Sequence, residues 1–328
     1  MADAGFIARS ADWKMFLKDA FAPNLAKDRK LCYGRSTNNV EKGKYIMIVD
    51  LHTHIFPSEI ASMAVDKLKR ASHTHPFSDG TSAGLVKSRQ EAGIDCCVIL
   101  PVATSPKQVV HMNDRAILTN DLYTETGLLS FGGMHPDYPD WKQELSRLAR
   151  AGVKGIKLHP VYQNVELDDL RYLRIMDRAA ELGLITLTHA GLDIGFPGAV
   201  FCTPEMVLHI YQELGGIPLI LAHMGGWRQW DGVERLVAQT PFYLDTAYCM
   251  GQITPLEGEP WTGGSLDTMS REQFLRFVEV FGAQRILFGT DSPWRDQKKG
   301  VEMVRSLPIS QAEKDAILGG NAVKLLKL

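Results

Sequence analysis

The stretch IMIVDLHTH, residues 46–54, decides both the fold and the site that this sequence predicts. It is an apolar run that ends in two histidines separated by one residue. Side chains two residues apart on a β-strand point to the same face of the strand. We therefore expect His52 and His54 to project side by side from the end of a buried strand, as two ligands of one metal ion do.

Seven further apolar runs follow, separated by amphipathic segments such as 169–182 and 271–281. The eight predicted strands are 46–51, 96–102, 128–134, 155–158, 185–188, 218–222, 242–245 and 286–289. Several lack polar alternation, which is typical of strands buried on both faces of a parallel sheet. Eight strand–helix units in about 280 residues fit an α/β fold, the (β/α)8 TIM barrel. A doubly wound open sheet is the alternative, but it explains less well the polar residues that recur at the strand ends.

Residues 1–45 lie outside these units and are predicted to be an N-terminal extension. Within it, Trp13, Phe16, Leu17, Ala20 and Phe21 fall at helical spacing, which predicts a short amphipathic helix. We expect this helix to pack on the barrel or on a partner subunit, so a homodimer stays open. Residues 46–328 are the predicted catalytic domain, and the Gly-, Pro- and Thr-rich segment 251–270 is predicted to be a long loop at its mouth.

The composition argues against several classes of function. The chain has 328 residues, 45% hydrophobic and 23% charged, which is ordinary globular composition. A formal net charge of −2 gives no reason to expect nucleic acid or an acidic membrane surface as partner. No apolar run approaches the roughly 20 residues of a membrane span, and five cysteines without a CxxC pair indicate reduced thiols. We expect a cytoplasmic protein with a small-molecule substrate.

Metal-capable side chains follow six of the eight predicted strands. In a TIM barrel the active site is built at the C-terminal ends of the strands. The residues at these ends are His52, His54, His135, His159, His189, His223 and Asp291. An aspartate directly after a buried strand is costly to desolvate without a partner, and a metal ion or a histidine would remove that cost. The pattern therefore predicts a metal site at one end of the barrel.

Lys157 shares a strand face with His159 because the two residues are two positions apart. Three roles are open for a buried lysine here: a carbamylated bridge between two metals, a contact to an anionic substrate, or a pair with a carboxylate. His135 and His159 are candidates for substrate binding or for a second metal ion.

Four motifs together resemble the amidohydrolase superfamily: DLHTH (50–54), LTHAG (187–191), AHMGG (222–226) and GTDSPW (289–294). The pattern is most similar to the amidohydrolase-2 type, the branch that includes aminocarboxymuconate semialdehyde decarboxylase. The resemblance covers residues 46–328. It implies that His52, His54, His189 and Asp291 bind one divalent metal ion, usually zinc. It leaves open a second ion, for which the candidate ligands are His159, His223 and His135.

The leading hypothesis is a metal-dependent hydrolase that acts on a C–N, ester or lactone bond of a small carboxylated molecule. Three imidazoles and one carboxylate suit Zn²⁺ and leave a position for water, whose pKa the metal lowers toward about 7. The catalytic candidates are His223, which would orient the water, and Asp291, which would pass its proton to the leaving group. The expected substrate-binding residues are Lys157, His159, Tyr162 and Trp294.

Two other reactions remain as alternatives. The first is a non-oxidative decarboxylase that uses the same metal site, with water or His223 supplying the proton that replaces CO₂. The second is a phosphoesterase or deoxyribonuclease, which the GMHP motif at 133–136 suggests more weakly.

Overall fold

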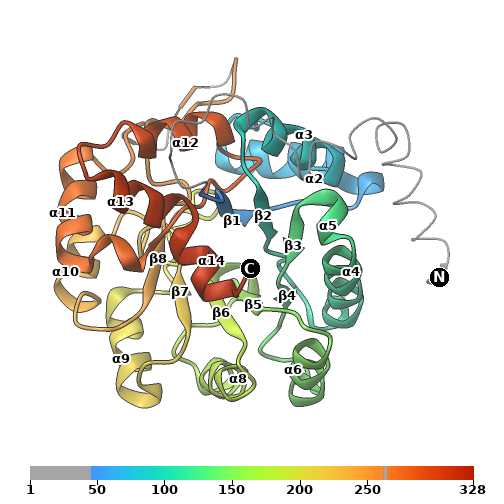
Figure 1. Ribbon diagram of the computed structural model, residues 1–328. Coiled ribbons are helices and arrows are strands. Elements are labelled where there is room, and N and C mark those ends of the chain that lie inside the picture. The colour runs from blue at the N-terminus through green and yellow to red at the C-terminus, as the bar shows by residue number, and fades with distance from the viewer. Residues whose placement is uncertain (1–45, 259, 262–263) are drawn as a thin grey trace. The chain divides into compact units, whose positions relative to one another are not determined.

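The strands of the computed structural model form a closed parallel ring with helices outside it (Figure 1). The structure describes residues 46–258, 260–261 and 264–328. The predicted TIM barrel is confirmed within these residues, whereas the helix predicted within residues 1–45 lies outside them.

The strands are β1 (Val49–Thr53), β2 (Cys96–Ile99), β3 (Leu128–Ser130), β4 (Gly132–Gly133), β5 (Gly155–Leu158), β6 (Ile185–Thr188), β7 (Leu219–Leu221), β8 (Tyr243–Asp245) and β9 (Ile286–Leu287). The longer helices are α2 (Ser58–Ser72), α3 (Ser82–Ala92), α4 (Val109–Asp121), α6 (Trp141–Arg150), α8 (Leu170–Glu181), α9 (Pro204–Leu214), α11 (Arg271–Phe281) and α12 (Gln297–Arg305). The shorter ones are α5 (Tyr123–Thr126), α7 (Pro160–Gln163), α10 (Trp230–Leu236), α13 (Gln311–Asp315) and α14 (Asn321–Leu326). Two 3₁₀ turns, η1 (Pro106–Gln108) and η2 (Ala283–Arg285), and a π-helical turn, η3 (Ala316–Gly320), complete the set.

The predicted strand 128–134 is interrupted between β3 and β4. The side chain of Asn120 accepts a hydrogen bond from the backbone N of Ser130 at 2.7 Å and donates one to its backbone O at 3.1 Å. Because these bonds occupy both backbone groups of Ser130, the regular ladder stops there. The ring nevertheless continues, since the backbone N of Phe131 donates to the backbone O of Ile99 at 3.0 Å.

The ring closes between the first and the last strand. The backbone N of Leu51 donates to the backbone O of Phe288 at 2.8 Å. The backbone N of His54 donates to the backbone O of Ser292 at 2.7 Å. Closure places the C-terminal ends of β1 and β9 side by side, although about 240 residues separate them in the chain.

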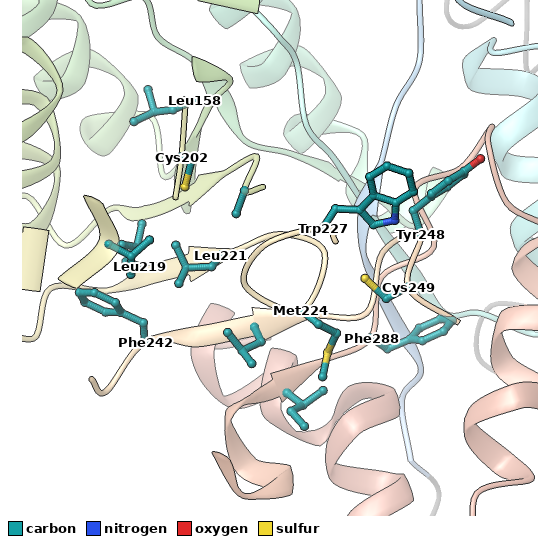
Figure 2. Close-up of a cluster of buried hydrophobic side chains, with 14 of the residues drawn as sticks. Leu158, Cys202, Leu219, Leu221, Met224, Trp227, Phe242, Tyr248, Cys249 and Phe288 are labelled. Carbon is teal, nitrogen blue, oxygen red and sulfur yellow. The ribbon is translucent and has the colours of Figure 1, made fainter. Parts of the chain in front are cut away.

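Two apolar layers hold the barrel together. The inner layer fills the ring with residues such as Leu51 and Leu187, and Ala322 and Leu326 of α14 pack against it. Figure 1 shows α14 and the C-terminus over the middle of the ring. Figure 2 shows part of a second layer, which includes Leu219. Among the described residues, no helix has both the length and the apolarity that crossing a bilayer requires.

Candidate metal centre

Three predicted ligands come together where β1 and β9 end. The Nε2 atoms of His52 and His54 lie 3.1 Å apart. The Oδ1 atom of Asp291 lies 3.6 Å from Nε2 of His52 and 3.2 Å from Nε2 of His54. Two ligands of one tetrahedral ion, each about 2.0–2.1 Å from it, are separated by about 3.3 Å. The three spacings therefore suit ligands of a single metal ion.

The local backbone explains how the two strand ends approach so closely. The backbone N of Asp291 donates to the backbone O of His52 at 2.8 Å. Asp291 itself is left-handed, with φ 67°, a region in which aspartate is enriched among non-glycine residues. Gly289 faces His52, and a Cβ atom at this glycine would lie 2.8 Å from the Cβ of the histidine. Glycine at 289 thus makes room for the first ligand.

Asp50 is a buried carboxylate that ties the same two strand ends together. Its Oδ1 accepts from the backbone N atoms of His52 at 3.2 Å and Thr290 at 3.0 Å. Its Oδ2 accepts from the hydroxyl of Thr290 at 2.5 Å and from Nε2 of Gln297 at 2.7 Å. Burial raises the pKa of Asp50 to about 6, while these bonds oppose the shift. The pattern of polar residues at the strand ends does not predict this role of Asp50.

Hydrogen bonds at Nδ1 leave the Nε2 atoms of both histidines available to a metal. Nδ1 of His52 donates to Oδ2 of Asp245 at 2.7 Å, and Nδ1 of His54 donates to the backbone O of Leu100 at 2.9 Å. An acceptor beside Nδ1 assigns the proton to that nitrogen, so Nε2 keeps its lone pair. Burial also holds the pKa of His52 well below its ordinary value, which favours the neutral ring. The donor set therefore fits a divalent ion.

His189, the fourth predicted ligand, forms a hydrogen-bonded pair with His223. Nδ1 of His223 donates to the backbone O of Ala247 at 2.8 Å, which leaves its Nε2 as an acceptor. That Nε2 lies 3.0 Å from Nδ1 of His189, so His189 is the donor in this pair. The remaining nitrogen of His189, Nε2, is buried and has no hydrogen-bond partner in the described part of the chain.

A second group of metal-capable side chains contains His189 together with His159 and Asp193. The ligand atoms of the three residues all lie within 4.8 Å of one another. This membership differs from the predicted second set of His159, His223 and His135. His223 bonds to His189 instead, and Nδ1 of His135 accepts from the backbone N of Asp137 at 3.1 Å. Among the described residues, His135 belongs to neither metal-capable group.

The residues predicted to bind substrate lie beside these groups. Burial lowers the pKa of Lys157 to about 8, against the raising effect of nearby carboxylates that include Asp245 and Asp291. The ring of Tyr162 stacks on that of His159, with centroids 3.9 Å apart. The half-buried Trp294 donates its backbone N–H to the backbone O of Asp291 at 2.8 Å.

A second cationic side chain, Arg295, follows Trp294. Its guanidinium lies 4.6 Å from the ring centre of Tyr248, and its Nη1 donates to the backbone O of Gln252. Its Nε and Nη2 atoms are buried without a hydrogen-bond partner among the described residues. Gln252 belongs to the predicted mouth loop, whose Thr254 accepts from the backbone N of His75 at 2.9 Å.

Comparison with known proteins assigns the family. The sequence model of the family described as Amidohydrolase matches residues 49–328. The chain therefore belongs to the amidohydrolase family, and the resemblance drawn from its motifs is confirmed. None of the curated proteins compared matches it.

Several solved structures share the fold at low sequence identity. An uncharacterised TIM-barrel protein from Bordetella bronchiseptica is 16% identical, with a TM-score of 0.66, covering 86% of this chain and 99% of that one. A manganese-bound 5-carboxyvanillate decarboxylase from Novosphingobium aromaticivorans is 14% identical, with a TM-score of 0.62 and coverage of 88% and 100%. The 2,6-dihydroxybenzoate decarboxylase from Rhizobium is 17% identical, with a TM-score of 0.59 and coverage of 86% and 99%.

Proposed function

We propose that this amidohydrolase-family chain is a metal-dependent, non-oxidative decarboxylase of a small aromatic carboxylic acid. Metal dependence rests on one observation, the 3.1–3.6 Å spacing of ligand atoms among His52, His54 and Asp291. The choice of reaction is supported by the neighbours of similar fold, two of which are decarboxylases of substituted benzoates.

The surroundings of the three ligands suit an anionic substrate with a ring. A divalent ion held there would act as a Lewis acid on a substrate oxygen. Lys157 is a buried cation and Arg295 a half-buried one, and the Nε and Nη2 nitrogens of Arg295 have no hydrogen-bond partner among the described residues. The rings of Tyr162 and His159, stacked with centroids 3.9 Å apart, form an aromatic pair whose edges a substrate ring could contact.

His223 has hydrogen bonds at both ring nitrogens, which limits its part in either reaction. In a hydrolase of this design His223 would orient the attacking water, and in a decarboxylase it could supply the proton that replaces CO₂. Here one nitrogen donates to Ala247 and the other accepts from His189. His223 therefore orients His189, and a proton that originates in solvent replaces CO₂ on carbon. Hydrolysis of a C–N, ester or lactone bond is the second candidate, favoured by the family description.

The ligand chemistry allows several metals. Imidazole nitrogen and carboxylate oxygen suit Zn²⁺, Mn²⁺ and Fe²⁺. The sequence predicts zinc, whereas one of the neighbours carries manganese. We therefore propose a divalent transition ion and would load the protein with Mn²⁺ and Zn²⁺ in parallel.

Isotopes from the solvent distinguish the two candidate reactions. The metal-loaded protein is incubated in D₂O with a panel of hydroxylated aromatic acids, and in H₂¹⁸O with esters, lactones and amides. Decarboxylation predicts release of CO₂ and one deuterium on the carbon that carried the carboxylate. Incorporation of ¹⁸O into an acid product, with no CO₂ from any aromatic acid, would contradict the proposal and support hydrolysis.

A further inference from the structure

We propose that Phe196, together with the edge of Tyr162, forms an outer aromatic subsite that selects the substrate. The acid selected there carries a second ring, or another flat apolar group, on the side away from its carboxylate. This proposal rests on the proposed function and narrows its substrate class. It is carried by a continuous series of side-chain rings that runs from the candidate metal ligands to the exposed ring of Phe196. The sequence motifs do not single out Phe196.

The inner part of this series consists of side-chain rings at the strand ends. The ring centre of His223 lies 5.3 Å from that of His52 and 4.8 Å from that of His189. His159 follows, with its ring centre 4.5 Å from that of His189. The ring of Tyr162 comes next and lies 3.9 Å from that of His159. Because each ring contacts the next, the five rings form one continuous wall.

The wall ends at an exposed phenylalanine. The ring centre of Phe196 lies 5.1 Å from that of Tyr162, and the two planes are inclined by 59°. This tilted geometry lies within the range of favourable aromatic pairs. Exposure rises along the series, from 1% at His52 and 7% at His159 to 51% at Phe196, with Tyr162 half-buried. The wall therefore connects the buried candidate ligands to the surface of the protein.

A turn in the segment after β6 sets the position of Phe196. The backbone O of Asp193 accepts from the backbone N of Phe196 at 3.1 Å, and its Oδ1 accepts from the backbone N of Gly195 at 2.8 Å. The turn lies against Tyr162, since a Cβ atom at Gly195 would be 4.0 Å from the hydroxyl O of Tyr162. Pro197 further restricts the backbone of the residue before it. The backbone thus presents the ring of Phe196 beside Tyr162.

The surroundings of Phe196, and not its exposure alone, identify it as a binding residue. Single exposed apolar side chains are common on protein surfaces. Val280 is one such residue, 41% exposed near the C-terminal end of α11. Phe196 differs because its ring contacts Tyr162, whose own ring stacks on that of His159. Its free surface therefore adjoins the wall that leads to the candidate metal ligands.

The length of the wall determines the class of substrate. Four rings lie between those of His52 and Phe196 in the series. A single-ring acid whose carboxylate lies beside His52 leaves the outer part of the wall uncovered. A second ring, attached opposite the carboxylate, contacts Phe196 and removes apolar surface of both partners from water. The subsite therefore favours an acid with two linked rings over benzoate.

Two acids of different length test the subsite by binding alone. The full-length protein, loaded with Mn²⁺, is titrated with benzoate and with biphenyl-4-carboxylate in a calorimeter. We expect the wild type to bind the two-ring acid more tightly. Phe196→Ala should weaken binding of the two-ring acid about 2- to 10-fold and leave the dissociation constant of benzoate unchanged. Phe196→Tyr keeps the ring and should keep the preference.

The matched control is Val280→Ala, which removes apolar atoms from an exposed position on an outer helix and should bind both acids like the wild type. Circular dichroism verifies that each variant is folded. Absence of a preference for the two-ring acid in the wild type would overturn the subsite. An unchanged preference in Phe196→Ala would also overturn it, as would an equal loss for both acids.

The CO₂ measurement separates failure of this subsite from failure of the proposed function. A preference for the two-ring acid that depends on Phe196, with no CO₂ from any aromatic acid, would retain the subsite and overturn decarboxylation. Release of CO₂ from single-ring acids, without a preference that depends on Phe196, would retain decarboxylation and overturn the subsite.

Discussion

Oδ2 of Asp245 accepts the hydrogen bond of Nδ1 of His52 at 2.7 Å, deep inside the barrel mouth. The other oxygen, Oδ1, accepts from the backbone N atoms of His223 at 2.9 Å and Ala247 at 3.0 Å. Both oxygens of this fully buried carboxylate are therefore occupied by donors. A carboxylate behind a metal-binding histidine fixes the orientation and the tautomer of the ring. Asp245 thus determines which nitrogen His52 presents to a metal.

Asp245→Asn should weaken metal binding although Asp245 is not itself a proposed ligand. The two backbone N–H groups require an oxygen, so the new amide group would face Nδ1 of His52. An amide donates, which would move the proton of His52 to Nε2 and block that nitrogen. We expect the metal dissociation constant, measured by competition with a coloured chelator, to rise about 10- to 100-fold. An unchanged dissociation constant in the folded variant would contradict this role.

Lys157→Met should stabilise the metal-free protein at pH 7 while it reduces activity. The side chain is 1% exposed, and burial lowers its pKa from 10.5 to about 8. Below pH 8 the folded protein therefore carries a charged lysine at a desolvation cost, and methionine removes that cost. Between about pH 8 and 10.5, Lys157 is neutral in the folded protein and charged in the unfolded chain. The free energy of unfolding of the wild type therefore rises with pH in this range, relative to that of the variant.

Thermal unfolding in the presence of a chelator at pH 7 and pH 9 measures this effect. The melting temperature of Lys157→Met should exceed that of the wild type at pH 7, and the difference should narrow at pH 9. Lys154→Met makes the same substitution at a half-buried position outside the barrel core and is the matched control. A lower melting temperature for Lys157→Met at pH 7 would show that the lysine stabilises its carboxylate neighbours instead.

Tyr162 should contribute its ring to substrate binding and not its hydroxyl. Tyr162→Phe keeps the ring that stacks on His159 at 3.9 Å, whereas Tyr162→Ala removes it. Once a substrate is known, we expect the Michaelis constant to stay near the wild-type value in Tyr162→Phe. In Tyr162→Ala it should rise up to about tenfold, because an aromatic contact contributes about 0.5–1.5 kcal/mol. A larger loss in Tyr162→Phe than in Tyr162→Ala is the result that speaks against this role.

Metal removal should lower the thermal stability of the wild type. An ion whose free concentration is about 100 times its dissociation constant stabilises the folded state by about 2.7 kcal/mol. We therefore expect the chelator to reduce the melting temperature by several degrees. Asp291→Asn should lose most of this shift. Asp168→Asn, which changes a carboxylate paired at 2.9 Å with the exposed His209, is the control and should keep it. Equal shifts in all three proteins would mean that the chelator acts elsewhere than on the group of His52, His54 and Asp291.

The barrel and part of its candidate centre could be predicted because strand periodicity and strand ends are local features. His52, His54 and Asp291 each follow an apolar run, and in a parallel barrel such ends meet at one rim. The same signal was available for Asp245, which ends the predicted strand 242–245. Its role follows only from its contact with His52, a residue 193 positions away in the chain.

The second group could not be predicted in the same way. The ring orientation of His189 depends on His223, whose own tautomer depends on the backbone O of Ala247. None of these contacts has a sequence signature. Asp193 lies five residues beyond the end of β6, outside the strand-end pattern, and it reaches His159 only because the following segment folds back. His135 satisfies the pattern, but its contact with Asp137 is local.

A crystal structure of the protein soaked in Mn²⁺ or Zn²⁺, measured at the absorption edge of the metal, tests the central claim most directly. The account predicts an anomalous peak about 2.0–2.2 Å from Nε2 of His52, from Nε2 of His54 and from a carboxylate oxygen of Asp291. Density maps without an anomalous peak between these three atoms, at millimolar metal and neutral pH, would contradict it.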